Sequence, residues 1–413
     1  MLPAPPPNAS ARDAWPSFAA IAAVGYVIYG LGATAPYLRT QLGLSDGEVG
    51  LHSTAMAFGL ILTGVVAARL DRRIGEIAVR GSAIAALIVA MLALAAAPAH
   101  VVTLGAAVLI GVGTGTVLGY TNAILARPGG RLARLRVARA NVWAMVAAFV
   151  CPVALAATAI LGLPWGAGLL PAVALLAILT FDLRAGPRLA PAAQSDAPGG
   201  RLPTGYWLAW LFLVSAIAVE FSIVFWGATL VERRTGVDTP TATLLGGLFL
   251  AGMFVGRLAQ SLGLGTRGDL RRTAGIGVVL AIIGAGIAWS STVALLSGLG
   301  LFVAGLGVAG LYPLGVAAAL GAAPGQLTLA GTRLTLASGT AVLAAPFALG
   351  LIADAAGVVV GWGLIVAMAG IALLLVAGLP SGRAADRDHD ADPSDDQPLR
   401  ARRSASSSAD SAS

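Results

Sequence analysis

The sequence has no lysine, a single cysteine and few charged residues of any kind. Only 11% of its 413 residues are charged, whereas a soluble globular domain carries about 25%. The chain therefore has too little charge to cover a water-facing surface. The single cysteine, Cys151, cannot form an intramolecular disulfide, and we expect it to be a small buried residue.

Several functional groups are missing as well. The chain has no GxxxxGK[ST] phosphate-binding loop, so it encodes no ATP-driven transport of its own. The three histidines (His52, His100 and His389) fall near outer span ends or in the C-terminal tail, where they form no metal cluster inside the membrane. No Ser/His/Asp set can be assembled in a cavity. We therefore expect no enzymatic activity, no cofactor and no bound metal.

Hydrophobic residues are abundant and are grouped in long blocks. They make up 57% of the chain, and the blocks have about 20 residues, the length that crosses a hydrocarbon core of roughly 30 Å. This pattern predicts an all-α polytopic membrane protein with twelve transmembrane helices and no soluble domain. The expected spans, to within a few residues, are 17–38, 48–70, 77–97, 101–125, 138–161, 165–183, 205–230, 240–263, 272–290, 293–320, 328–353 and 357–379.

Composition divides the chain into five parts. Residues 1–16 are rich in proline and lack the basic start of a signal peptide, so we expect a disordered tail and no cleaved leader. Two six-helix bundles follow, at 17–183 and 205–379, joined by a polar cytoplasmic linker at 184–204. Asp, Arg and Ser predominate from 380 to 413, which predicts a second disordered tail.

The arginines are distributed unevenly between the loops. A net charge of +7 would suit a nucleic-acid-binding protein, but the placement of the charge indicates a membrane protein. If the N-terminus is inside, the inner loops hold sixteen arginines and the outer loops only three, namely Arg39, Arg233 and Arg234. Such an excess is typical of cytoplasmic loops. We therefore expect a multi-pass protein of the cytoplasmic (inner) membrane, with both termini in the cytoplasm and no nucleic-acid partner.

Two stretches of the chain are similar to each other. GLILTGVVAARL (Gly59 to Leu70) and GLFLAGMFVGRL (Gly247 to Leu258) lie 188 positions apart and agree at six positions, Arg69 and Arg257 among them. Further along, GVGTGT in the fourth span resembles GLGVAG in the tenth. A repeat at half the chain length predicts two equivalent halves, and in membrane transporters such halves meet at the transport pathway.

The loop between the second and third spans contains ARLDRRIG (Ala67 to Gly75). This segment resembles the Gly-x-x-x-Asp-Arg-x-Gly-Arg signature of the major facilitator superfamily in part: Asp71 and Arg72 match, Ala67 replaces the first glycine, and Gly75 is displaced by one position. Twelve spans in two parallel halves also resemble that family. The resemblance implies that Asp71 and Arg72 hold a cytoplasmic gate by charge pairing. Charge that only sets topology is the alternative.

The resemblance further implies that the first, fourth, seventh and tenth spans line a central cavity. Polar and aromatic residues on these spans are the predicted lining: Tyr26, Tyr29, Asn122, Trp226 and Tyr312. Aromatic rings with polar edges suit a cavity for sugar-like or amphipathic solutes. The alternatives are an interfacial anchor for Trp and Tyr, and an interhelical hydrogen bond for Asn122.

Glu220 is the most informative single residue, because it lies about 14 residues into the seventh span, roughly 20 Å along the helix. An ionised carboxylate near the membrane midplane costs on the order of 2–3 kcal/mol. We expect Glu220 to bind a proton or the substrate. A structural pair or hydrogen bond with a neighbouring helix is the alternative.

Three other charged residues lie on or at the ends of spans. Arg69 and Arg257 could each extend to the membrane surface, and Arg257 could instead point inward to bind an anion or pair with an acid. Asp354 ends the eleventh span at the outer face, where it could cap the following helix or belong to an outer gate.

These features together predict a secondary active transporter of a small organic solute, sugar-like or otherwise polar, that works by alternating access and is driven by protons. It needs only a bilayer, protons and its substrate, and one chain with two halves can act as a monomer. A drug/proton antiporter is the alternative, although the fourth span lacks an outer arginine and the fifth lacks the glycine-rich run of family exporters. A membrane enzyme or sensor without transport is the second alternative.

Overall fold

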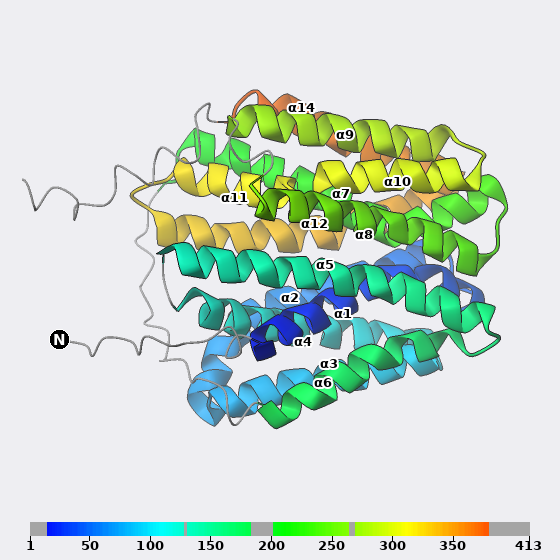
Figure 1. The fold of residues 1–413 in the computed structure, drawn as a ribbon, viewed down its shortest axis with the longest axis horizontal. Helices are drawn as coiled ribbons and strands as arrows, with labels where there is room; N and C mark the ends of the chain where they lie inside the picture. The colour runs from blue at the N-terminus through cyan, green and yellow to red at the C-terminus, as the bar shows by residue number, and fades with distance from the viewer. Residues whose placement is uncertain (1–14, 128–129, 183–200, 264–268, 380–413) are drawn as a thin grey trace, which may run out of the picture.

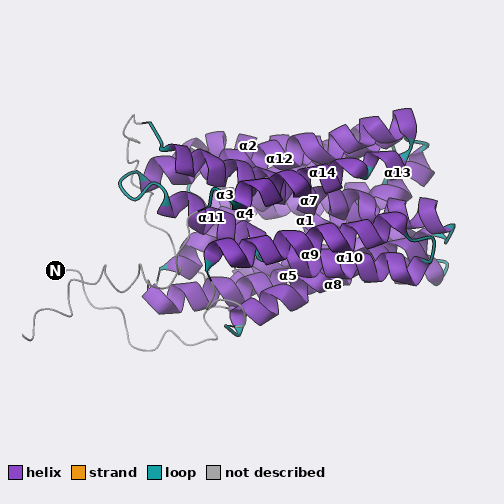
Figure 2. Ribbon diagram, turned by 90° about the horizontal axis from the view of Figure 1, so that it is seen from above, coloured by secondary structure: helices purple, strands orange, loops and turns teal. Residues whose placement is uncertain are grey.

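The computed structural model describes residues 15–127, 130–182, 201–263 and 269–379, which form a bundle of helices lying side by side along its long axis (Figures 1 and 2). The predicted tails, apart from Trp15 and Pro16, and most of the predicted linker lie outside the described residues. The described residues therefore correspond to the membrane-spanning part of the chain that the hydrophobic blocks predict.

The first six spans are present with bounds close to those expected. They are α1 (Trp15–Leu42), α2 (Asp46–Ile74), α3 (Glu76–Ala96), α4 (His100–Ala126), α5 (Gly130–Ile160), and a sixth span made of the 3-10 helix η2 (Trp165–Leu169) and α6 (Leu170–Asp182).

Two of the last six spans are each built from two helices. The second half contains α7 (Thr204–Thr235), α8 (Thr239–Ser261), α9 (Leu270–Ser290), α10 (Ala294–Val308), α11 (Leu311–Gly321), α12 (Leu327–Ala356), α13 (Val358–Gly361) and α14 (Gly363–Val376). The tenth span divides into α10 and α11 just before Pro313. Proline has no backbone N–H to donate to the preceding turn, so the helix is interrupted there.

Ten of the described helices are long and apolar enough to cross a membrane. The sixth span, Trp165–Phe181, is a shorter apolar helix, and α2 supplies the second span. The chain is therefore a multi-pass helical membrane protein, and its helices account for the twelve expected spans.

The two halves pack their helices in the same pattern. In the first half α1 packs on α5, α4 packs on both α2 and α3, and α6 covers α3. In the second half α7 packs on α12, α10 packs on both α8 and α9, and α14 covers α9. The halves lie one below the other in Figure 1 and meet where α2 packs on α12, α5 on α8 and α1 on α7. Equivalent helices therefore form both sides of the interface.

Close helix crossings give the register of this repeat. A Cβ atom on Gly59 would lie 2.2 Å from the Val108 carbonyl oxygen, and one on Gly252 would lie 2.1 Å from that of Phe302. Gly59 thus corresponds to Gly252, at a step of 193 residues. The same step relates the N-cap of α2, Ser45, to that of α8, Asp238. The sequence alignment of α2 with α8 at a step of 188 was therefore wrong by five residues.

The misalignment has a physical cause and a consequence for the site. With 54 glycines and many leucines, several registers of two apolar helices match by chance. In the register of the structure, Arg257 corresponds to Gly64 rather than to Arg69. The two arginines therefore occupy different depths of their helices.

Candidate functional site

Glu220 lies in α7 with its side chain buried, at 5% exposure. Its Oε1 accepts a hydrogen bond of 2.6 Å from the hydroxyl of Tyr29 on α1. The Tyr29 ring stacks on Phe221, with 6.0 Å between the ring centroids. This contact joins the first helix of each half. A change in the protonation of Glu220 would therefore act directly on the interface between the halves.

A guanidinium and a second phenol complete this arrangement. Arg257 of α8 interacts electrostatically with Glu220 and approaches the Tyr29 hydroxyl. Its Nε is buried and has no hydrogen-bond partner among the described residues. Tyr312 of α11 lies within electrostatic range of both charges, and its hydroxyl approaches Ser338 of α12. We call Glu220, Tyr29, Arg257 and Tyr312 the central site; Arg257 points into the bundle rather than to the membrane surface.

The central site combines an acid, a permanent cation and two phenols that come from both halves. Tyrosine hydroxyls both donate and accept hydrogen bonds, whereas a guanidinium only donates. Such a set can hold a proton on the carboxyl group and bind a polar solute. No group of three or more His, Cys, Asp or Glu residues in the described part of the chain is placed to hold a metal ion.

Three of the predicted cavity residues lie elsewhere. The Tyr26 hydroxyl donates to the carbonyl oxygen of Gly168 within the first half. Trp226 is 0% exposed, and its Nε1 donates to the Pro346 carbonyl oxygen at 2.9 Å. Asn122 is exposed near the end of α4. Tyr26 thus connects helices within the first half, and Trp226 connects helices within the second. Of the predicted set, only Tyr29 and Tyr312 approach Glu220.

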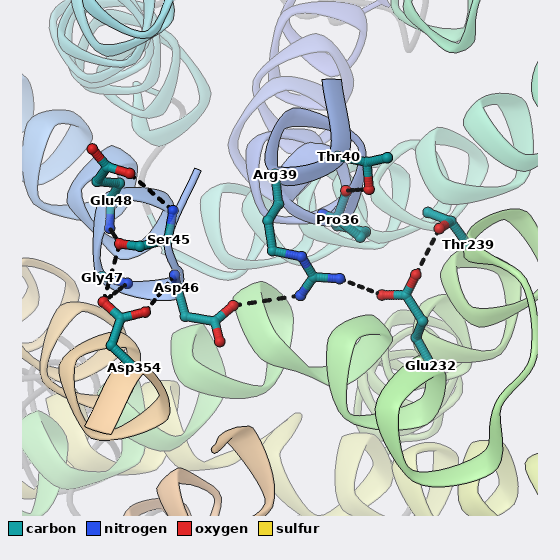
Figure 3. Close-up of polar contacts among 10 residues, drawn as sticks. All are labelled: Pro36, Arg39, Thr40, Ser45, Asp46, Gly47, Glu48, Glu232, Thr239 and Asp354. Carbon is teal, nitrogen blue, oxygen red and sulfur yellow. Dashed lines mark hydrogen bonds and ion pairs between the residues drawn. The ribbon is translucent and has the colours of Figure 1, made fainter. Parts of the chain in front are cut away.

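A network of charged residues joins the halves at the predicted outer end (Figure 3). Arg39 of α1 contacts Glu232 of α7 at 2.6 Å and Asp46 of α2 at 3.4 Å. Glu232 also accepts a hydrogen bond of 2.7 Å from the Thr239 hydroxyl. We call Arg39, Asp46, Glu232 and Thr239 the outer-end network. Because its ion pairs are largely buried, with side chains 13–18% exposed, solvent screens them only in part.

The outer-end network follows the internal repeat. Arg39 and Glu232 lie 193 positions apart, the step that relates the two halves, so they are equivalent residues of opposite charge. The same step relates Asp46 to Thr239. Two equivalent residues can touch each other only close to the axis that relates the halves. The Arg39–Glu232 pair therefore closes the centre of this end of the bundle.

Asp354 makes a second connection between the halves at the same end. Its Oδ1 accepts a hydrogen bond of 2.7 Å from the backbone N–H of Asp46, and its Oδ2 accepts bonds of 2.8 Å from the N–H of Gly47 and 3.0 Å from the Ser45 hydroxyl. Asp354 thus caps α2 of the other half, rather than the helix that follows it. The free N–H groups and positive dipole at the start of α2 attract the carboxylate.

The other charged candidates lie near the predicted inner end of the bundle. Asp71 of α2 is half-buried and interacts with the Tyr120 hydroxyl of α4, in the same half. Arg69 and Arg72 are exposed near the end of α2. The gating role that the resemblance implies for Asp71 and Arg72 stays a prediction.

Sequence reasoning missed the members of the outer-end network. Arg39 counted only as one of three outer arginines, and Asp46 and Glu232 carried no signal as isolated acids. One pattern could have found them: an acid and a base at equivalent positions of the first and seventh spans. That pattern is visible only in the 193-residue register.

No family model and no curated protein sequence matches the chain, but solved structures match it over most of its length. The xylose transporter XylE from E. coli, in a partially occluded inward-open conformation, is 11% identical, with 89% of this chain and 97% of that chain covered and a TM-score of 0.69. A bacterial homologue of the human lysosomal transporter Spinster, inward-facing and occupied, is 14% identical, with 88% and 94% covered and a TM-score of 0.64.

A third match is to FucP, a transporter of the major facilitator superfamily in its outward conformation. It is 15% identical, with 87% of this chain and 97% of that chain covered and a TM-score of 0.56. All three likenesses extend over both halves, in agreement with the repeated helix packing described above. The chain therefore has the fold of the major facilitator superfamily transporters.

Proposed function

We propose that this protein is a secondary active transporter that moves a small polar organic solute across the cytoplasmic membrane and couples this movement to protons. The substrate binds at the central site, and Glu220 carries the proton. The observation that supports this most directly is the 2.6 Å hydrogen bond from Tyr29 of the first half to Glu220 of the second. Two halves that meet at a buried polar site can rock about it and expose it to each side in turn.

Coupling arises because the proton competes with Arg257 for the carboxylate of Glu220, and the solute competes with that carboxylate for Arg257. The charged carboxylate attracts Arg257 and accepts the hydrogen bond from Tyr29. A proton on Glu220 removes that attraction and leaves the guanidinium free to donate to a solute. Because an ionised carboxylate in the membrane interior costs about 2–3 kcal/mol, the protonated form passes more easily through the closed intermediate.

Within this cycle, we assign the structure to a state that is closed at the predicted outer end. The outer-end network and Asp354 hold the halves together at the predicted outer end. Opening to the outside must therefore break the contacts of Arg39 and Asp354.

The charge of the central site favours a neutral polar solute over a cationic drug. Arg257 acts electrostatically on Glu220 and would repel a second cation bound at the same site. The phenols of Tyr29 and Tyr312 can bond hydroxyl groups and stack on sugar-like rings. Among the matched structures XylE is named as a xylose transporter, so D-xylose is the first probe.

The test uses the full chain in liposomes with an imposed pH gradient, and a panel of labelled sugars and nucleosides beginning with D-xylose. We expect gradient-driven accumulation of at least one solute, and its loss in Glu220→Gln while exchange without a gradient persists. Tyr29→Phe should weaken coupling less, because the carboxyl group stays. Glu48→Gln neutralises an acid whose side chain is 46% exposed, outside the central site, and serves as the control.

Three results would contradict the proposal. Gradient dependence that survives Glu220→Gln would remove this residue from the coupling scheme. Export of a cationic dye such as ethidium, with no flux of sugars or nucleosides, would favour the drug antiporter. Solute binding with no flux in either direction would favour a sensor.

A further inference from the structure

We propose that the end of the second half where α7 and α12 begin binds the phosphate headgroup of an anionic phospholipid. An open depression of about 360 Å³ lies there, lined by Arg201, Leu202, Trp207, Leu329 and Arg333. These residues belong neither to the central site nor to the outer-end network. The inference is therefore independent of the solute that the protein transports.

The walls of the depression are fixed by hydrogen bonds to the main chain of both arginines. Nε1 of Trp210 on α7 donates to the Arg333 carbonyl oxygen at 3.0 Å. Nε2 of Gln326 donates to the Arg201 carbonyl oxygen at 3.4 Å. These bonds tie the segment before α7 to the start of α12. The two arginines that line this hollow thus extend from backbone that these hydrogen bonds hold in place.

The charge of the lining suits a phosphate group. Arg201 and Arg333 are its charged members, and both are exposed. Neither forms an ion pair with an acidic side chain among the described residues. Guanidinium groups bind phosphate oxygens through two parallel hydrogen bonds, with a geometry that lysine does not offer. The N-terminal ends of α7 and α12 add positive potential at the same place.

The apolar part of the lining favours a lipid over a free anion. Trp207 is 41% exposed, and Leu202 and Leu329 lie beside it in the same lining. An inorganic phosphate ion gains nothing from such a wall, whereas the glycerol and first methylenes of a phospholipid can pack on it. Tryptophan is also enriched where helices cross the membrane surface. The arginine distribution predicts that this end faces the cytoplasmic leaflet, whose anionic lipids attract basic residues.

The test measures lipid binding to the purified full chain in a neutral detergent by calorimetry and native mass spectrometry. The probes are short-chain phosphatidylglycerol, phosphatidylcholine with the same chains, and inorganic phosphate. We expect saturable binding of phosphatidylglycerol. The Arg201→Gln/Arg333→Gln variant should bind it about tenfold more weakly or worse. The Arg201→Lys/Arg333→Lys variant keeps the charge, and its affinity for phosphatidylglycerol should lie between those of the wild type and the double Gln variant.

A second pair of arginines serves as the control that distinguishes binding at this site from a general effect of surface charge. Arg271 and Arg272 are two exposed arginines at the start of α9, at the same end of the bundle and outside the depression. Arg271→Gln/Arg272→Gln should change the affinity for phosphatidylglycerol by less than about twofold, with both variants melting like the wild type. Equal weakening by the two pairs, or equal binding of phosphatidylcholine, would overturn the site. Displacement of the lipid by inorganic phosphate would assign it to a soluble anion instead.

Discussion

The two ends of the bundle contain the same kinds of charged residue but connect them differently. At the predicted outer end Arg39 of the first half binds Glu232 of the second, and Asp354 of the second half caps α2 of the first (Figure 3). At the predicted inner end the Arg80–Glu76 pair, at 3.2 Å, lies within α3. The Arg39–Glu232 ion pair at the outer end therefore joins the halves, whereas this inner pair stabilises a single helix.

The difference shows that the position of a charge relative to the axis of the repeat matters more than the number of charges. The predicted inner loops are richer in arginine, and that excess sets the orientation in the membrane. Arg39 and Glu232 are single charges, yet they meet because they are equivalent residues close to the axis. Four substitutions test this comparison, in order of decreasing expected effect.

The largest effect is expected from Arg39→Glu. The new carboxylate would lie between Asp46 and Glu232, so attraction becomes repulsion in a largely buried place. We expect the closed outer end to lose roughly 3 kcal/mol, about a hundredfold in the ratio of closed to open protein. Spin labels at Thr40→Cys and Arg233→Cys, in a Cys151→Ala background, would report a longer distance between the outer ends of α1 and α7.

Exchange of the two charges is the control for Arg39→Glu. The double variant Arg39→Glu/Glu232→Arg restores an attractive pair at the axis and should recover part of the short distance. Recovery is incomplete because Asp46 remains next to the new carboxylate. An equally open outer end in the double variant would show that the pair does not hold the halves together.

The next effect is expected from Asp354→Asn. An amide keeps the shape but loses the charge that faces the N-terminus of α2, at a cost of about 1–2 kcal/mol. The fraction of molecules that show the long distance between the two labels should rise about tenfold. Asp238→Asn is the matched control, because Asp238 is the N-cap of α8 and makes no side-chain capping bond. A change of equal size in this control would contradict the bridging role of Asp354.

A smaller effect is expected from Gly47→Ala. The added Cβ would lie 2.6 Å from Oδ2 of Asp354, so the carboxylate must move and its bond to the Gly47 N–H weakens. We expect a loss of about 1 kcal/mol in outer-end closure, measured by the same label distance. In the control Gly64→Ala, also in α2, the new methyl group meets no atom within 4 Å. If both variants opened the end alike, the effect would come from α2 itself.

The smallest effect is expected from Arg80→Gln at the inner end. It removes an ion pair between side chains four residues apart on α3, which is worth about 0.3–0.5 kcal/mol. The melting temperature should fall slightly, and the label distance at the outer end should not change. Opening of the outer end by this variant would contradict the distinction between the two ends.

Much of the fold could be predicted from the sequence, because membrane helices carry a strong local signal. The positions of all twelve spans and the break near Pro313 follow from apolar runs and from proline chemistry. Glu220 was recognisable as a buried acid for the same reason, since a lone charge in an apolar run has few alternatives. Trp226 was not predictable in this way: its indole N–H bonds the Pro346 carbonyl, a partner 120 positions away.

The sequence by itself determined the number and order of the helices, the existence of a repeat and the acid at the centre of α7. Only the tertiary structure decided that Tyr29 bonds that acid and that Arg257 comes within electrostatic range of it. It also decided that Arg39 pairs with its own counterpart and that Asp354 caps a helix of the other half. The physical reason is that helix formation and burial depend on neighbouring residues along the chain. Contacts between helices depend on their relative register, and frequent glycine and leucine leave that register undetermined until the helices pack.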